Sequence, residues 1–279
     1  MSLPTLRTEP ESGQSAGYDR RSAVALLCLV SVGAAVGYHW NDLLDANGQL
    51  DLLLLGIWLV MAACITWNVS PRRDLALLLV GLCGGFVIEW WGTTTGLWRY
   101  FTNERPPLWI LPAWPIAALS TDRLGTLLER GARRLEQRAG FASTDLRLTR
   151  GYRVVFYLVV PAFVAGMIAF SWPARGVLST KVVFFLMVAL ALYSTLPRRD
   201  VLVFFSGAGL GIFLEYWGTS RMCWIYYTEQ VPPPIAVLAH GFAALAFARA
   251  ADAVLGAFTR LLGGLRPAGS QRQSENAAS

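Results

Sequence analysis

Long uninterrupted apolar blocks are the feature that most constrains how this chain can fold. Each block is roughly 20 residues long, the length at which a helix crosses a hydrocarbon core of about 30 Å. A soluble domain would instead alternate apolar residues with charges at helical or strand spacing. With 54% hydrophobic and only 15% charged residues, the sequence predicts an all-α polytopic membrane bundle of about eight transmembrane helices. The expected spans are 22–40, 50–69, 75–92, 107–121, 153–172, 178–196, 201–218 and 233–250.

The fourth block differs from the others because it carries Pro112 and Pro115 and runs into an amphipathic stretch, 123–138. Leucines recur on one side of that stretch, so we expect it to leave the membrane as a helix lying along the surface. The polar termini, 1–21 and 267–279, lack the apolar residues needed for a core, and we expect them to be disordered.

Arginines gather in the connections on one side of the predicted bundle, together with both chain ends. Positively charged loops stay cytoplasmic, so we expect a multi-pass protein of the cytoplasmic (inner) membrane with both termini inside. The net charge of +6 does not indicate nucleic-acid binding, because the arginines form short clusters between apolar blocks and no continuous basic face. The four cysteines have no CxxC spacing and are interpreted as small packing residues.

A tandem repeat divides the chain into two similar halves. The run Pro71-Arg72-Arg73-Asp74, interpreted as a topology anchor, recurs as Pro197-Arg198-Arg199-Asp200 at an offset of 126 residues. Matches at that offset continue to Thr102 and Thr228 and predict a duplication. Because each unit holds an even number of spans, the copies are expected to share one orientation about an axis along the membrane normal. The predicted parts are an N-terminus 1–21, a four-helix repeat 22–140, a cytoplasmic linker 141–152, a second four-helix repeat 153–266 and a tail 267–279.

Glycines and a glutamate recur four residues apart in the third span and in the seventh, and so share one helical face in each. They are Gly81, Gly85 and Glu89, matched by Gly207, Gly211 and Glu215. Small residues at this spacing let helices approach closely in lipid. We therefore expect the third and seventh spans to meet near the pseudo-twofold axis, with Glu89 and Glu215 facing a common cavity towards the extracytoplasmic end.

The other rare polar residues fall at the same depth, among many aromatic residues. His39 and Asp42 lie near the end of the first span, and His240 lies near the outer end of the eighth. The aromatic residues are Trp90, Trp91, Trp98, Tyr100, Tyr216, Trp217, Trp224 and Tyr226. Together these residues predict one polar, aromatic-walled pocket that opens on the outer half of the bilayer.

Simpler interpretations remain open for each of these residues. The glutamates could be helix-end acids held by Arg99 or Arg221, the aromatic residues an interfacial belt, and His39 a snorkelling side chain. His240 is more suggestive, because Trp114 occupies its position in the first half. No local ligand pair such as HExxH is present, so we expect neither a metal nor a cofactor.

One motif resembles a known family. The string Gly85-x3-Glu89-x2-Gly92-x3-Gly96-x-Trp98-x-Tyr100, followed by Pro107, Pro112 and Trp114, is similar to a motif of the membrane-bound carotenoid-biosynthesis family that includes bisanhydrobacterioruberin hydratase. The second half departs from it, since Met222 stands in place of Gly96 and His240 in place of Trp114. The resemblance covers about 35 residues of each half.

The resemblance implies an enzyme that acts on a long polyisoprenoid. Two neighbouring carboxylates favour sharing one proton, so one of Glu89 and Glu215 would be an acid and the other a base. The acid would protonate an alkene, and the faces of Trp91 and Trp217 would stabilise the carbocation. Capture of water, or loss of a proton to the partner carboxylate or His240, would end the reaction.

The sequence therefore favours a membrane enzyme whose partners are the bilayer and a hydrophobic lipid or isoprenoid substrate, with the oligomeric state left open. A small proton-coupled transporter is the first alternative, because duplicated bundles with intramembrane acids suit such carriers. A non-catalytic membrane subunit is the second.

Overall fold

A computed structural model describes residues 17–44, 52–141, 146–194 and 196–264. The parts of the predicted termini that fall in 1–16 and 265–279 lie outside these residues. The first half contains α1 (Arg20–Leu44), α2 (Leu52–Thr66), α3 (Pro71–Thr94), β1 (Trp98–Tyr100), the 3-10 helix η1 (Leu108–Ile110) and α4 (Ala113–Arg138). The second contains α5 (Leu146–Phe170), the 3-10 helix η2 (Trp172–Ala174), α6 (Leu178–Leu192), α7 (Pro197–Ser220), β2 (Trp224–Tyr226) and α8 (Pro234–Gly264).

Apolar helices dominate the described part of the chain, and they indicate a multi-pass membrane protein. By length and composition, α1, α3, α5, α7 and α8 could each cross a bilayer, whereas α2 and α6 contain shorter apolar helices, Leu55–Thr66 and Leu178–Leu192. Many large apolar side chains on their outer faces are exposed, Phe185 at 72% for example. In water such a surface would favour aggregation, so it suits a lipid environment.

The prediction for the fourth block is wrong. Residues 107–121 do not form a span of their own, because η1 and the start of α4 divide them, and the amphipathic stretch simply continues α4 as far as Arg138. The first residue of that stretch, Arg123, is fully buried. The Arg123 guanidinium bonds the Trp67 carbonyl oxygen at 3.0 Å and the Asp74 carboxylate at 2.6 Å.

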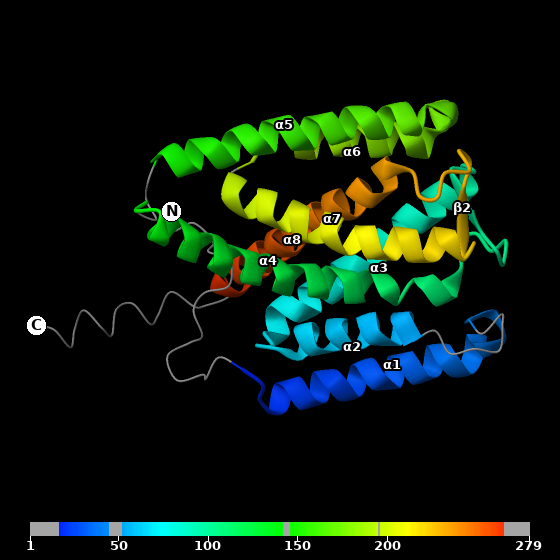
Figure 1. Ribbon diagram of the computed structural model, residues 1–279, viewed down its shortest axis with the longest axis horizontal. Helices are drawn as coiled ribbons and strands as arrows, with labels where there is room; N and C mark the ends of the chain where they lie inside the picture. Colours follow the sequence, from blue (N-terminus) through cyan, green and yellow to red (C-terminus); the bar gives the residue numbers. More distant parts are fainter. Residues whose placement is uncertain (1–16, 45–51, 142–145, 195, 265–279) are drawn as a thin grey trace, which may run out of the picture.

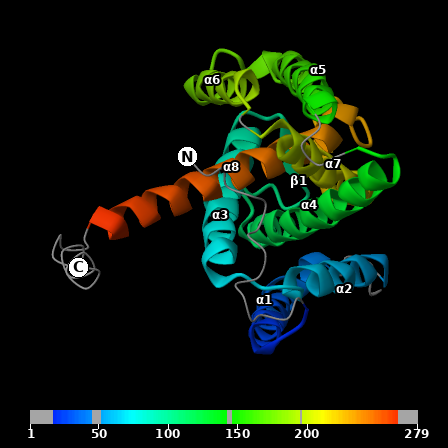
Figure 2. The same cartoon turned by 90° about the vertical axis from the view of Figure 1, so that its left-hand side faces the viewer.

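Four helices form the centre of the molecule. α3 packs on α4 and α8, and α7 packs on α8 and α4. The remaining helices flank this centre in two pairs, α1 with α2 on one side and α5 with α6 on the other, as Figures 1 and 2 show. The flanking pairs are not equivalent, because α5 contacts both α7 and α8 whereas α1 packs mainly on α2.

The expected meeting of α3 and α7 through their glycines is wrong. The glycines admit the following helix of the same half instead. A Cβ on Gly81 would lie 2.9 Å from Pro115 Cα on α4, and a Cβ on Gly207 would lie 2.5 Å from the His240 carbonyl oxygen on α8. The glycine motif therefore predicts correctly that another helix packs closely on α3 and on α7. The helices that do so are α4 and α8.

A short sheet closes one end of the central helices. β1 and β2 pair antiparallel, with Trp98 opposite Tyr226 and Tyr100 opposite Trp224. The all-α prediction did not include these strands, which are three residues each. Because the strands come from the two halves of the chain, their pairing brings the aromatic residues of both halves into one cluster.

Buried ion pairs hold the opposite end. Pro71 begins α3, where a missing N–H costs nothing, and the Asp74 carboxylate accepts a bond from the Ser70 N–H at 2.9 Å. Arg73 donates to Asp252 on α8 at 2.8 Å, and Arg199 on α7 pairs with the same carboxylate. The repeated Pro-Arg-Arg-Asp runs thus begin two central helices and connect both to α8. Their predicted role as topology anchors in the membrane stays a prediction.

We predict that Asp252→Ala destabilises the fold. Asp252 is the shared acceptor of two arginines whose side chains are only 13% and 8% exposed. Removing it takes this carboxylate from the buried Arg199 guanidinium, whereas Arg73 keeps its pair with Asp122. The expected loss is about 3 kcal/mol in the free energy of unfolding, measured by denaturant titration in detergent micelles. Arg72→Ala, at an exposed neighbouring position, is the control. Equal stability of the two variants would contradict this role for Asp252.

Candidate functional site

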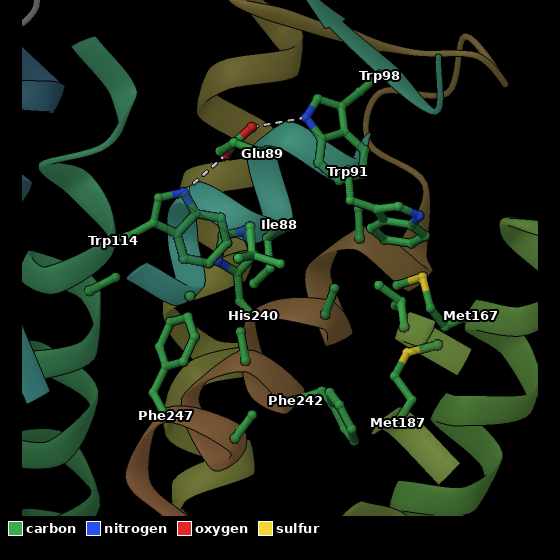
Figure 3. A pocket seen from close by; sticks show the side chains of 18 of the residues that line it. Ile88, Glu89, Trp91, Trp98, Trp114, Met167, Met187, His240, Phe242 and Phe247 are labelled. Atoms are coloured by element: carbon green, nitrogen blue, oxygen red, sulfur yellow. Dashed lines mark hydrogen bonds between the residues drawn. The ribbon is translucent and has the colours of Figure 1, made fainter. Parts of the chain in front are cut away.

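A cavity of about 480 Å³ lies among the central helices, α5 and α6, directly beneath the β1–β2 pair. Its walls are almost wholly apolar, with Met167, Met187, Phe242 and Phe247 around its lower part (Figure 3). Glu89, Glu215 and His240 also line it. They are the carboxyl and imidazole side chains among the described lining residues, and these are the groups that most often act as general acids and bases.

Glu89 is bound by aromatic donors of its own half. Its side chain is only 3% exposed, and the indole N–H groups of Trp98 and Trp114 each donate to it at 3.0 Å, one to each carboxylate oxygen (Figure 3). The Tyr100 side chain lines the same end of the cavity. Each of the indole bonds offsets part of the cost of removing a carboxylate from water.

Glu215 has the matching environment in the second half, with one substitution. The Trp224 indole donates to Oε2 at 3.0 Å, the Tyr226 hydroxyl donates to Oε1 at 2.9 Å, and His240 Nε2 lies 2.9 Å from Oε1. Each partner sits 126 residues beyond the corresponding partner of Glu89, so His240 occupies the place of Trp114. One carboxylate therefore has an indole where the other has an imidazole.

The two unlike rings meet face to face. The Trp114 and His240 rings are stacked, with centroids 6.0 Å apart and planes 13° apart. Because each ring bonds its own glutamate, the stack joins the two carboxylates across the interface between the halves. Both carboxylates line the same cavity. The expected common cavity for Glu89 and Glu215 is therefore present.

Glycines make room for the rings that hold the glutamates. A Cβ on Gly92 would lie 2.0 Å from the Trp98 indole, and a Cβ on Gly218 would lie 2.0 Å from the Trp224 indole. The turn that leads to each strand is also alike in the two halves, since Gly96 and Met222 both take the left-handed conformation, with φ of 73° and 56°. The departure from the motif at Met222 therefore leaves the strand in place.

The predicted aromatic residues divide into two groups. Trp91, Trp98, Tyr100, Trp224 and Tyr226 line the cavity.

The prediction is wrong for the other three, which do not line it. Trp90 is 43% exposed and Tyr216 is 56% exposed, which suits an interfacial belt. Trp217 packs beside the aromatic cluster beneath the Arg221 guanidinium, 5.3 Å from the ring centroid.

His39 is also wrongly predicted as a site residue. It is exposed on α1 and packs edge to face with Tyr38, with ring centroids 5.4 Å apart. Because α1 packs mainly on α2, His39 cannot reach the cavity. The side chain of Asp42, predicted beside it, lies outside the described residues.

Sequence reasoning missed part of the site. In the sequence, Trp114 is recognisable only as part of a motif and as the residue at the position of His240. Because the two positions are equivalent, their rings could have been expected to bond the two equivalent glutamates. Thr180 on α6 accepts the Trp91 indole N–H at 2.9 Å, and the methionines of α5 and α6 complete the wall. No sequence signal marks these residues, because an apolar wall looks like any other buried helix face.

Comparison with protein-family models, curated proteins and solved structures finds no match for this sequence. Within the described residues, no three His, Cys, Asp or Glu side chains gather as a metal-binding group. The arguments about function therefore rest on the cavity and its residues.

We predict that Gly85→Ala disrupts the Glu89 site. The new methyl group would lie 2.2 Å from Trp114 Cγ, so the indole must leave its position over α3 and lose its bond to Glu89. Overpacking of this kind costs about 1–3 kcal/mol and should also change the near-ultraviolet circular dichroism of the tryptophans. Gly209→Ala, at a helical glycine with open space around it, is the control and should change neither measurement. An unchanged spectrum for Gly85→Ala would show that Trp114 is not held this way.

Proposed function

We propose that this chain is an integral enzyme of the cytoplasmic membrane that acts on a polyisoprenoid or carotenoid-like lipid. Its reaction would be acid–base chemistry, the protonation of an alkene followed by hydration or cyclisation. The observation that carries the proposal is the pair of buried carboxylates in an apolar cavity, one of them bonded to a histidine. The resemblance of the Glu89 motif to carotenoid-biosynthesis enzymes supports the same chemistry.

The proposal includes the architecture that the sequence predicts. The chain would be a duplicated unit of four helices, with both copies in the same orientation and both termini cytoplasmic. Matching hydrogen bonds at positions 126 residues apart support the duplication. The arginines of the ion-pair network lie at the end of the helices away from the glutamates, which supports a site towards the outer face.

The cavity suits a hydrocarbon ligand with one reacting group. A cavity of about 480 Å³ falls within the range of roughly 300–1,000 Å³ typical of sites for small organic ligands. Apolar walls favour a hydrocarbon chain, and the polar groups gather at the end beneath the strands. An alkene placed there would lie against acids and aromatic faces, where a developing positive charge is stabilised.

The partners of the two glutamates indicate a division of roles. Indoles donate hydrogen bonds but cannot accept a proton, so Trp98 and Trp114 hold Glu89 without exchanging protons with it. His240 can both give and take a proton. We therefore assign proton transfer to the Glu215–His240 pair, and to Glu89 the stabilisation of positive charge.

In a hydration, the steps balance as follows. The Glu215–His240 pair gives its proton to one alkene carbon, and the neighbouring carbon becomes a cation facing Glu89 and the aromatic rings. The oxygen of water then bonds to that carbon, and a water proton returns to the Glu215–His240 pair. In a cyclisation a second double bond of the substrate attacks the cation instead, which closes a ring and leaves a new cation. That cation loses a proton to the same Glu215–His240 pair and forms a double bond.

We predict that Glu215→Gln and Glu89→Gln both abolish lipid conversion. Loss of the positioned acid and base at Glu215 lowers turnover by about 10²–10⁴-fold. Loss of the negative charge at Glu89, which stabilises the cation, lowers it by about 10²–10³-fold. Mass spectrometry of lipid extracts from cells with and without each variant would show the accumulated substrate, and a mass difference of one water would identify a hydratase. Glu104→Gln, at an exposed glutamate, is the control.

Full conversion by both glutamine variants, folded and in the membrane, would refute the enzyme proposal. A change in uptake with no lipid difference would instead identify a transporter.

A second prediction separates His240 from its counterpart. His240→Ala should lose turnover by a similar factor, about 10²–10⁴, and added imidazole should restore part of it by occupying the vacated space beside Glu215. Trp114→Ala provides the matched control, since an indole carries no transferable proton and imidazole should not rescue that variant. If His240→Ala converted the lipid at the full rate without imidazole, His240 would have no role in proton transfer.

A further inference from the structure

The wall of the cavity is incomplete between α3 and α6. Cys83 and Val87 on α3 and Leu186 on α6 line the cavity and are also exposed, Val87 at 53% and Leu186 at 52%. Ala113, at the start of α4, is the other exposed lining residue. The cavity is only partly enclosed, and exposed side chains among its lining residues mark the place where it opens, so α3 and α6 border a mouth.

The depth of this mouth indicates what lies outside it. Cys83 is near the middle of α3 and Leu186 near the middle of α6. At 1.5 Å per residue, Val87 lies about 24 Å along a helix of about 36 Å, which is within a hydrocarbon core of about 30 Å. The side chains around the mouth are apolar, so the mouth faces acyl chains and not water.

Within the described residues, aromatic side chains cover the outer end of the cavity. β1 and β2 cover its outer end with Trp98, Tyr100, Trp224 and Tyr226. Of these, Tyr100, Trp224 and Tyr226 are buried, and Trp98 is partly buried against Trp91 and Tyr226. The polar residues of the site therefore lie beneath an aromatic roof, with the opening to the side and below them.

We infer that the ligand of this cavity is a long-chain lipid that enters sideways from the hydrocarbon core between α3 and α6. Its terminal part reaches Glu215 and His240, and the rest of its chain stays in the bilayer. The size of the cavity supports this, because it matches a small organic ligand and not a whole polyisoprenoid. The inference rests on the proposed function for the identity of the ligand, but entry through the mouth can be tested without turnover.

The test uses photolabelling of the full chain in lipid nanodiscs. The probe is a geranylgeraniol analogue that carries a diazirine at the end remote from its hydroxyl group, and peptide mass spectrometry locates the label. We expect the label on cavity residues that adjoin Glu215, such as Trp224 and Tyr226. We also expect its loss in the double variant Val87→Trp/Leu186→Trp, in which two indoles fill the mouth.

The matched control is Phe86→Trp/Phe185→Trp. These residues adjoin the mouth residues in sequence and are exposed at 44% and 72%, but they do not line the cavity. Labelling should persist in this control. Equal labelling of the cavity in the two double variants would overturn lateral entry. Lateral entry would also be overturned if a water-soluble prenol analogue with the same diazirine labelled the cavity of Val87→Trp/Leu186→Trp.

A second way of closing the mouth avoids any effect on folding. In a Cys28→Ser/Cys64→Ser/Cys223→Ser background, Leu186→Cys and the native Cys83 can be bridged by a bifunctional maleimide after the protein has folded. Bridging should abolish cavity labelling by the geranylgeraniol analogue, and undiminished labelling would overturn the inference. Failure of the proposed function is distinguishable, because Glu215→Gln would then convert lipid normally whatever the labelling pattern.

Discussion

Two carboxylates buried in an apolar bundle are the constraint on which the rest of the structure depends. An unpartnered buried carboxylate would cost several kcal/mol even after relaxation. Glu89 and Glu215 avoid that cost because aromatic N–H and O–H groups bond to both carboxylate oxygens. The donors come largely from the strands, so the β1–β2 pairing is part of the site and not merely a connection.

The same constraint explains the glycines and the ends of the helices. Indole rings can reach the glutamates only if the helix backbone lacks side chains beneath them, as at Gly92 and Gly218. At the other end, Asp252 joins Arg73 and Arg199 and ties α3 and α7 to α8. Charged groups thus hold both ends of the central helices, and the middle is left to apolar contacts and the cavity.

The sequence predicted the helices and the glutamate pair well, because both follow from local patterns. Apolar block length predicts helices, and spacing by four places Gly85 and Glu89 on one face whatever the fold. The partner of that face does not follow, since small residues indicate close approach without naming the neighbour. That is why α3 was expected to pack on α7, while the structure packs it on α4 and α8. His39 was misassigned for a similar reason, because depth in the membrane says nothing about lateral position.

A duplicated fold need not keep duplicated chemistry. Most contacts around Glu89 recur around Glu215, so the shape of the site depends on features common to both halves. The exchange of Trp114 for His240 changes neither the stacking of the two rings nor the bond to each carboxylate. It does change whether a proton can be transferred along that hydrogen bond, because an indole keeps its proton whereas an imidazole can transfer one. The mouth between α3 and α6 adds a second asymmetry, because it is bounded by one helix from each half. In the proposed mechanism, the exchange of Trp114 for His240 gives the pair of acids a direction, because Glu215 would exchange protons with an imidazole while Glu89 stays bonded to indoles.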